Sequence, residues 1–161
     1  MVFEVRPGSL LYVAGTVVHG FGRGSKQLGI PTANLDPYTV SQLPSSVTNG
    51  IYFAWAKVDE HPIAKSVVSI GWNPYFKNST RSVEAHIMRT FQEDFYGSVL
   101  HLLLLKYHRP ERDFNSLSDL IECIRDDILQ ADEYLNQPGP SHWKEITWFS
   151  TCISPTENGV P

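Results

Sequence analysis

Residues 15–34 read GTVVHGFGRGSKQLGIPTAN and hold 5 of the 11 glycines of this 161-residue chain. The apolar TVV near the start has the composition of the end of a β-strand. Glycine reaches positive φ without a Cβ penalty, and it lets a polyphosphate lie close to backbone N–H groups. The strand, the loop and the turn ending in Pro31-Thr32 therefore indicate a phosphate-binding arrangement, with an ordinary glycine-rich hairpin loop as the alternative.

The loop does not match the common phosphate-binding motifs. A Walker A motif needs glycine directly before lysine, but Ser25 separates Gly24 from Lys26. The dinucleotide-binding fingerprint opens a helix, whereas Pro31 follows soon after Gly24 and no helical periodicity is present. Glycine spacing alone therefore does not identify the loop.

Several segments along the chain have the composition of β-strands. Short strands separated by turns, before any helix, indicate a closed or nearly closed antiparallel barrel. We predict a mainly β fold: a small, closed, antiparallel, Greek-key-like barrel of six strands with one C-terminal amphipathic helix packed on it. The predicted strands are 10–18, 51–58, 64–70, 81–89 and 99–108, with residues 1–9 as a loose lead-in and 35–50 as an irregular surface segment.

The predicted helix begins at Ser116, which forms a capping box with Asp119. Apolar residues then recur at helical spacing, and this stripe should lie on the barrel. Gln137-Pro-Gly-Pro ends the helix, and the tail could add a short strand around 147–153. The stripe consists of Leu117, Leu120, Ile121, Ile124, Ile128 and Leu135.

Length and composition limit the classes of function. We predict one domain over 1–161, with a core at about 10–135 and a C-terminal extension at 136–161. A net charge of −4 argues against binding nucleic acid through its phosphates. No apolar run is long enough for a membrane span, no signal peptide is visible, and two cysteines give no disulfide framework. We expect a cytoplasmic monomer with no membrane or nucleic-acid partner.

Several long motifs together resemble the riboflavin kinases, or flavokinases, of the monofunctional eukaryotic kind. The resemblance covers about residues 10–135 and is more specific than any single glycine motif. It implies an ATP:riboflavin 5′-phosphotransferase that makes FMN and ADP. The motifs are HGFGRGSKQLGIPTANL at 19–35, TNGIYFAWA at 48–56, VVSIGWNPYFKN at 67–78, EAHIMRTFQEDFYG at 84–97 and RPERDFNSL at 109–117.

Thr32 and Asn34 are the predicted metal ligands. They are two residues apart, so in extended backbone their side chains point the same way. Magnesium prefers hard oxygen ligands and shares its coordination shell with phosphates and water. The spacing alone is also compatible with turn chemistry, but the resemblance implies that this pair holds Mg²⁺.

Glu84 is the predicted catalytic residue. Phosphoryl transfer to an alcohol needs an acceptor for the hydroxyl proton, and a carboxylate can serve as that acceptor. Its spacing in SVEAHIM alone favours a solvated residue at a strand edge. The resemblance implies that it is the general base, with His86 as a structural neighbour.

The resemblance also implies the substrate-binding residues. Arg89 departs from the residue usual at its position, and Arg112 replaces a family lysine with retention of charge. Without the resemblance, the basic pair in RPERDF could be a solvated loop. For ATP the residues are Gly20, Lys26, Thr32, Asn34, Ile87, Arg89 and Tyr96, and for the flavin they are Arg109, Arg112 and Phe114.

A second class of function remains open at the level of the sequence. A small barrel can hold a flavin or a nucleotide without any chemistry, because a fold alone does not decide function. An oligonucleotide-binding barrel is a weaker alternative, since the acidic balance disfavours it.

Overall fold

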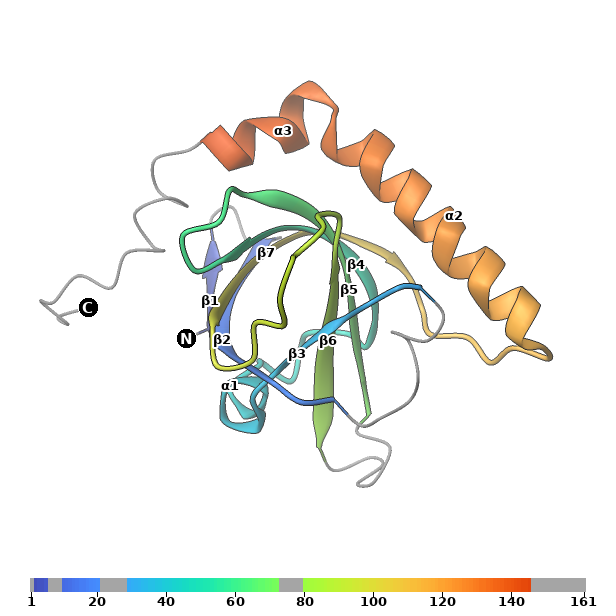
Figure 1. The fold of residues 1–161 in the computed structure, drawn as a ribbon, viewed down its shortest axis with the longest axis horizontal. Coiled ribbons are helices and arrows are strands. Elements are labelled where there is room, and N and C mark those ends of the chain that lie inside the picture. The colour runs from blue at the N-terminus through green and yellow to red at the C-terminus, as the bar shows by residue number, and fades with distance from the viewer. Residues whose placement is uncertain (1, 6–9, 21–28, 73–79, 146–161) are drawn as a thin grey trace, which may run out of the picture.

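Six antiparallel strands close into a barrel, and helix α2 runs along its outside (Figure 1). The computed structural model describes residues 2–5, 10–20, 29–72 and 80–145. The predicted mainly β fold, a closed six-stranded antiparallel barrel with a C-terminal helix, is confirmed. The strands are β1 (Val2–Val5), β2 (Leu10–Val18), β3 (Ala33–Leu35), β4 (Gly50–Val58), β5 (Ala64–Trp72), β6 (Arg81–Ile87) and β7 (Val99–Arg109). The helices are α1 (Pro37–Ser41), α2 (Leu117–Leu135) and α3 (Pro138–Glu145).

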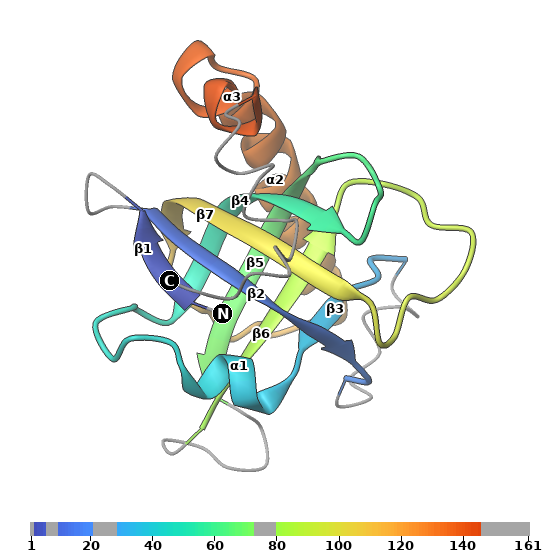
Figure 2. The ribbon, with the colours of Figure 1, turned by 90° about the vertical axis from the view of Figure 1, so that its left-hand side faces the viewer.

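The barrel closes through its shortest strand. The strand order is β2-β3-β6-β5-β4-β7, and β7 pairs again with β2. On the opposite edge of β2, β1 pairs with the first half and β3 with Val17 and Val18 (Figure 2). The three residues of β3 are therefore the link between β2 and β6.

Strands β4 and β7 bury both faces, which explains why their sequences are nearly continuous apolar runs. One face lines the barrel interior, where Ala54, Leu102 and Leu104 belong to the internal core. The other face packs under α2, where Phe53 and Leu103 meet Leu135. The period-two polar alternation is lost over the central part of these strands, because both of their faces are buried there.

Helix α1 depends on a close approach between β2 and the helix. Asp36 caps the helix: its carboxylate accepts hydrogen bonds from the N–H of Thr39 at 2.9 Å and of Thr16 at 2.8 Å. Burial opposes ionisation of Asp36, but these hydrogen bonds lower its pKa. A Cβ at Gly15 would collide with the side chains of Thr39 and Asp36, so only glycine fits there. The predicted irregular segment 35–50 therefore contains a short helix.

Ser116 is confirmed as the N-cap of α2, which is one half of the predicted capping box, but the full stripe does not pack on the barrel. Ser116 Oγ accepts a hydrogen bond from the N–H of Asp119 at 3.1 Å. Leu135 is fully buried, whereas Leu117 is 59% exposed, so the prediction that Leu117 lies on the barrel is wrong. The packing is tight only toward the C-terminal half of the helix.

Two terminal segments are more ordered than the sequence suggests. The sequence predicts a loose lead-in at 1–9, but Val2–Val5 pairs with β2 as strand β1. Helix α3 begins at Pro138, directly after the predicted helix end, since proline is tolerated in a first helical turn. The indole N–H of Trp55 donates to the carbonyl of Pro140 at 2.9 Å and ties α3 to the barrel. The strand predicted around 147–153 lies outside the described residues.

None of the helices in the described part of the chain is both long enough and apolar enough to cross a membrane.

His101 is a buried ionisable group on β7. It is 6% exposed, and its Nδ1 lies 2.5 Å from the hydroxyl of Tyr12 on β2. Burial, together with the positive charge of Lys57, lowers the pKa of His101 from 6.5 to about 4. The ring is therefore neutral in the folded protein at pH 7, and it becomes costly to keep buried as the pH falls.

We predict that His101 makes the folded state sensitive to mild acid. The pKa of His101 is lower in the folded state than in the unfolded state. Its contribution to the stability of the folded state is therefore complete above pH 6.5 and is lost between pH 6.5 and 4. When the pH is lowered from 7 to 5, the free energy of unfolding measured in urea should fall by about 1–2 kcal/mol less in His101→Gln than in the wild type. An equal loss in the two proteins would contradict the assignment.

Candidate functional site

The pairing of β3 with β6 places two polar residues opposite each other. Asn34 is opposite Glu84, and Ala33 is opposite Ala85. Both alanines belong to the internal core, and side chains alternate between the two faces of a strand. Asn34 and Glu84 therefore lie on the outer face of the barrel.

Thr32 extends this polar face by one position. Its hydroxyl donates to the Glu84 carboxylate with Oγ1 and Oε2 3.5 Å apart, at the long end of hydrogen bonding. His86 supports the same segment, because its Nδ1 lies 2.9 Å from the carbonyl of Pro31. A half-buried hydroxyl and a half-buried carboxylate thus meet where residues 30–32 cross β6.

Both Thr32 and Glu84 line a cavity of ≈ 220 Å³ between the barrel and α2, the helix-side cavity. Six of its fifteen lining residues are branched aliphatic, and its polar groups include three carboxylates and two guanidinium groups. A flat, largely apolar ligand with a polar edge would suit such a lining. The lining is Ile30, Thr32, Ile51, Val67, Ser69, Glu84, His86, Arg109, Glu111, Arg112, Phe114, Leu120, Ile124, Asp127 and Ile128.

Asn34 carries an unused acceptor. It is 8% exposed, and within the described residues its Oδ1 has no hydrogen-bond partner. Leaving such a group unpaired costs about 1–3 kcal/mol, which a ligand at this point would recover. A Cβ at Gly20 would lie only 2.5 Å from Asn34 Nδ2, so glycine is needed where the loop begins.

A metal at this point would rely on neutral oxygen ligands. In the described part of the chain, no group of three or more His, Cys, Asp or Glu residues is arranged to hold a metal ion. The carbonyl oxygen of Asn34 and the hydroxyl of Thr32, on either side of Ala33, are the candidate protein ligands.

Arg109, the last residue of β7, forms a buried ion pair with Asp127 of α2. Arg109 Nε donates to Oδ1 at 2.9 Å, and Nη2 donates to Oδ2 at 2.6 Å. Hydrogen bonding to Asp127 raises the pKa of Arg109, so the guanidinium stays charged. His108 Nε2 lies 3.3 Å from the same carboxylate, although burial lowers the pKa of His108. The pair clamps α2 to the barrel beside the cavity.

The segment from Pro110 to Ser116 supplies the remaining wall. Arg112 and Phe114 both line the helix-side cavity, as expected for flavin-binding candidates. The Glu111 carboxylate packs against Gly71, where a Cβ would collide with it. The predicted flavin residues are therefore brought together at one cavity, alongside Glu84 and Thr32.

The predicted adenine-side residues are more dispersed. Ile87 is 7% exposed and belongs to the internal core, while Arg89 is exposed just beyond β6. Tyr96 is 48% exposed and stacks on His19, with ring centroids 3.7 Å apart and planes at 26°. Lys26 lies outside the described residues. His19 directly precedes Gly20, so the stack lies where the glycine-rich loop begins.

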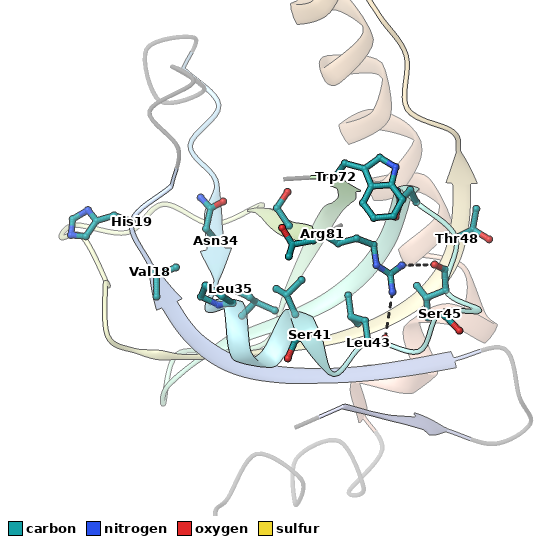
Figure 3. Close-up of a pocket in the computed structure, with 16 residues that line it drawn as sticks. Val18, His19, Asn34, Leu35, Ser41, Leu43, Ser45, Thr48, Trp72 and Arg81 are labelled. Atoms are coloured by element: carbon teal, nitrogen blue, oxygen red, sulfur yellow. Dashed lines mark hydrogen bonds between the residues drawn. The ribbon is translucent and has the colours of Figure 1, made fainter. Parts of the chain in front are cut away.

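A second cavity of ≈ 800 Å³ lies beside α1, and Asn34 lines it. Figure 3 shows Arg81 of this α1-side cavity turned toward the segment after α1 and away from Asn34. Its guanidinium donates to the carbonyls of Val47 at 2.5 Å and Pro44 at 2.9 Å. Arg81 therefore holds that segment in place. Asn34 lines the α1-side cavity, whereas Thr32 lines the helix-side cavity.

Two residues of this region were missed by the sequence reading. Asp127 falls on the apolar stripe of α2 at helical spacing, so its burial could have been noticed. The sequence pattern could not identify Arg109 as the partner of Asp127, because Arg109 belongs to a different element. His19 has no local signal, since its ring contact with Tyr96 joins segments far apart in the chain.

Comparisons with known proteins agree on one family. The family model described as "Flavokinase: Riboflavin kinase" matches residues 7–135. The human protein named "Riboflavin kinase" is 49% identical over 148 residues, covering 92% of this chain and 96% of the human protein. An Arabidopsis thaliana "Bifunctional riboflavin kinase/FMN phosphatase" is 43% identical over 133 residues, covering 83% of this chain and 35% of that protein.

The fold is shared with a solved structure. The crystal structure of riboflavin kinase from Trypanosoma brucei superposes with a TM-score of 0.72 at 26% identity. The match covers 95% of each chain.

Proposed function

The chain belongs to the riboflavin kinase family of ATP-dependent phosphotransferases, and from this premise we propose which residues carry the reaction. The reaction transfers the γ-phosphate of ATP to the 5′-hydroxyl of riboflavin and gives FMN and ADP. The observation that supports the assignment is the meeting of Thr32 and Glu84 in the helix-side cavity, with Asn34 opposite Glu84.

The helix-side cavity is the proposed flavin site. Its aliphatic walls suit the flat isoalloxazine ring, and Phe114 offers a ring for stacking. Arg109 and Arg112 offer N–H donors to the polar edge of the flavin. Glu84 lines the same cavity, which would bring the ribityl chain within reach of its carboxylate.

Glu84 is the proposed general base. As the 5′-oxygen of riboflavin attacks the γ-phosphorus, the bond from phosphorus to the bridging oxygen of ADP breaks and the hydroxyl proton passes to Glu84. The hydrogen bond from Thr32 and the β3–β6 pairing would hold the carboxylate in place. Positioning of this kind is the main contribution that a protein makes to phosphoryl transfer.

The residues present fit a magnesium ion. Among the described residues, Asn34 Oδ1 is a buried, hard oxygen with no hydrogen-bond partner, and the Thr32 hydroxyl lies two positions before it in the chain. These two residues, with phosphate oxygens of ATP, would hold the ion. When bound, Mg²⁺ would neutralise negative charge on the phosphates.

The start of the glycine-rich loop is the proposed phosphate site. Gly20 lies against Asn34 and leaves no room for a side chain, so its backbone is close to the proposed metal ligands. Lys26 would add a positive charge for the phosphates. Tyr96 and Arg89 are exposed and available to the adenine, whereas Ile87 would act through its backbone or its place in the core.

The reaction itself is the first prediction. Purified protein with riboflavin, ATP and Mg²⁺ should form FMN, separated and detected by flavin fluorescence. No FMN should form without ATP or with the metal removed by chelation. Riboflavin that is bound but never converted, across several nucleotides and metals, would leave only a binding module.

Replacing the proposed base should affect turnover more than binding. Glu84→Gln removes the proton acceptor but keeps a side chain of the same shape, so kcat should fall about 10²- to 10⁴-fold. Riboflavin binding, followed by fluorescence, should change little. Glu60→Gln, in the exposed turn after β4, is the matched control and should keep full turnover. An undiminished kcat in Glu84→Gln would exclude its role as the base.

Replacing a proposed metal ligand should abolish the stabilisation of the protein by ATP with Mg²⁺. ATP with Mg²⁺ should raise the Tm of the wild type, because a ligand that binds only the folded state stabilises it. This increase should vanish in Thr32→Ala and in wild type treated with EDTA. An equal Tm increase in Thr32→Ala would show that Thr32 does not hold the metal.

A further inference from the structure

Asp127 is an unusual residue for its place on α2. The buried residues of the helix are Asp127, Ala131 and Leu135, and Asp127 is 3% exposed. An apolar residue would bury more cheaply there, because a buried carboxylate loses its hydration. Replacing buried ion pairs by apolar residues is often neutral or stabilising, so helix docking alone gives a weak reason for an ion pair here.

The ion pair fixes the orientation of the guanidinium. The two bonds from Nε and Nη2 of Arg109 to Asp127 form a bidentate fork, which sets the plane of the group. A third bond, from Nη1 to the carbonyl of Pro110 at 3.0 Å, fixes its rotation. Among the described residues, these bonds use three of the five N–H donors of the guanidinium; because Arg109 lines the helix-side cavity, the other two can serve a ligand there.

The same pair holds three walls of that cavity together. Arg109 ends β7, Asp127 lies on α2, and the bond to Pro110 fixes the start of the segment that carries Arg112 and Phe114. His108 is stacked on Phe53 with ring centroids 4.4 Å apart, and its Nε2 lies 3.3 Å from Asp127 Oδ1, the oxygen that also accepts from Arg109 Nε. The carboxylate is therefore held by β7 and cannot turn freely into the cavity.

We propose that Asp127 is a positioning residue for the flavin: it acts through Arg109 and aims the two remaining N–H donors of the guanidinium at the bound riboflavin. This inference rests on the proposed flavin site. It assigns Asp127 an effect on riboflavin affinity and none on ATP.

The test compares Asp127→Asn with Asp132→Asn. Asp132 lies on the same helix and pairs with Lys65 of β5, but neither residue lines the helix-side cavity, so its loss is a matched control for helix docking. Asp127→Asn should raise the Kd for riboflavin about 10- to 100-fold, the loss expected for a misdirected charged hydrogen bond. The KM for ATP should stay within about 2-fold, and Asp132→Asn should leave both constants within about 2-fold.

A double-mutant cycle with Arg109→Gln separates an indirect from a direct role. If Asp127 acts through Arg109, adding Asp127→Asn to Arg109→Gln should weaken riboflavin binding by less than about 3-fold further. A full additional loss would overturn the proposal, because Asp127 would then contact the flavin itself. The double variant is neutral at both positions and leaves no unpaired buried charge, so the comparison of Arg109→Gln with the double variant stays measurable even if Asp127→Asn alone unfolds.

The remaining outcomes separate this inference from the proposed function. A wild type that neither binds nor phosphorylates riboflavin would overturn both. A wild type that phosphorylates riboflavin, with an Asp127→Asn variant that loses Tm but keeps the wild-type riboflavin Kd well below its Tm, would overturn the positioning role alone.

Discussion

Barrel closure through β3 is the constraint on which the rest of the structure depends. Only Ala33–Leu35 bridge β2 and β6 among the described residues, and they do so by two residue pairs on each side. Ala33 and Leu35 fill the barrel interior, so the residue between them must face outward. The closure therefore fixes Asn34 opposite Glu84, and the same three residues that complete the sheet bring together two polar groups of the proposed site.

The second constraint is the packing of α2 against the barrel, which differs between the two halves of the helix. The C-terminal half of the helix packs tightly through Ala131 and Leu135, whereas Leu120, Ile124 and Ile128 face the helix-side cavity. One part of the apolar stripe of α2 thus packs in the core, and the other part forms a wall of the cavity. The Arg109–Asp127 pair lies at this division, so the ion pair sets how far the helix can approach the barrel there.

The sequence predicted the elements whose signals are local. Strand-like segments located β2, β4, β5, β6 and β7, and the Ser116 cap located the start of α2. The sequence did not predict β1, β3, α1 or α3, because each is stabilised by distant partners: β2 for β1, β2 and β6 for β3, Gly15 for α1 and Trp55 for α3. The residues of the site came from long motifs rather than from spacing, since the contact of Thr32 with Glu84 spans 52 positions.

The Arg109–Asp127 pair shows where local pattern reaches its limit. Spacing on α2 shows that a carboxylate falls on the buried face, and physical chemistry then requires a cationic partner. The pattern does not show which cation, because the partner lies on a different element, 18 positions away in the chain. Once Arg109 is known to be the partner, the position of the ion pair indicates its role. A pair far from any cavity would only fix the helix, but Arg109 and Asp127 both line the cavity that also holds Glu84. The buried charge is therefore better explained by the orientation of a binding group than by stability, since apolar packing could have supplied the stability alone.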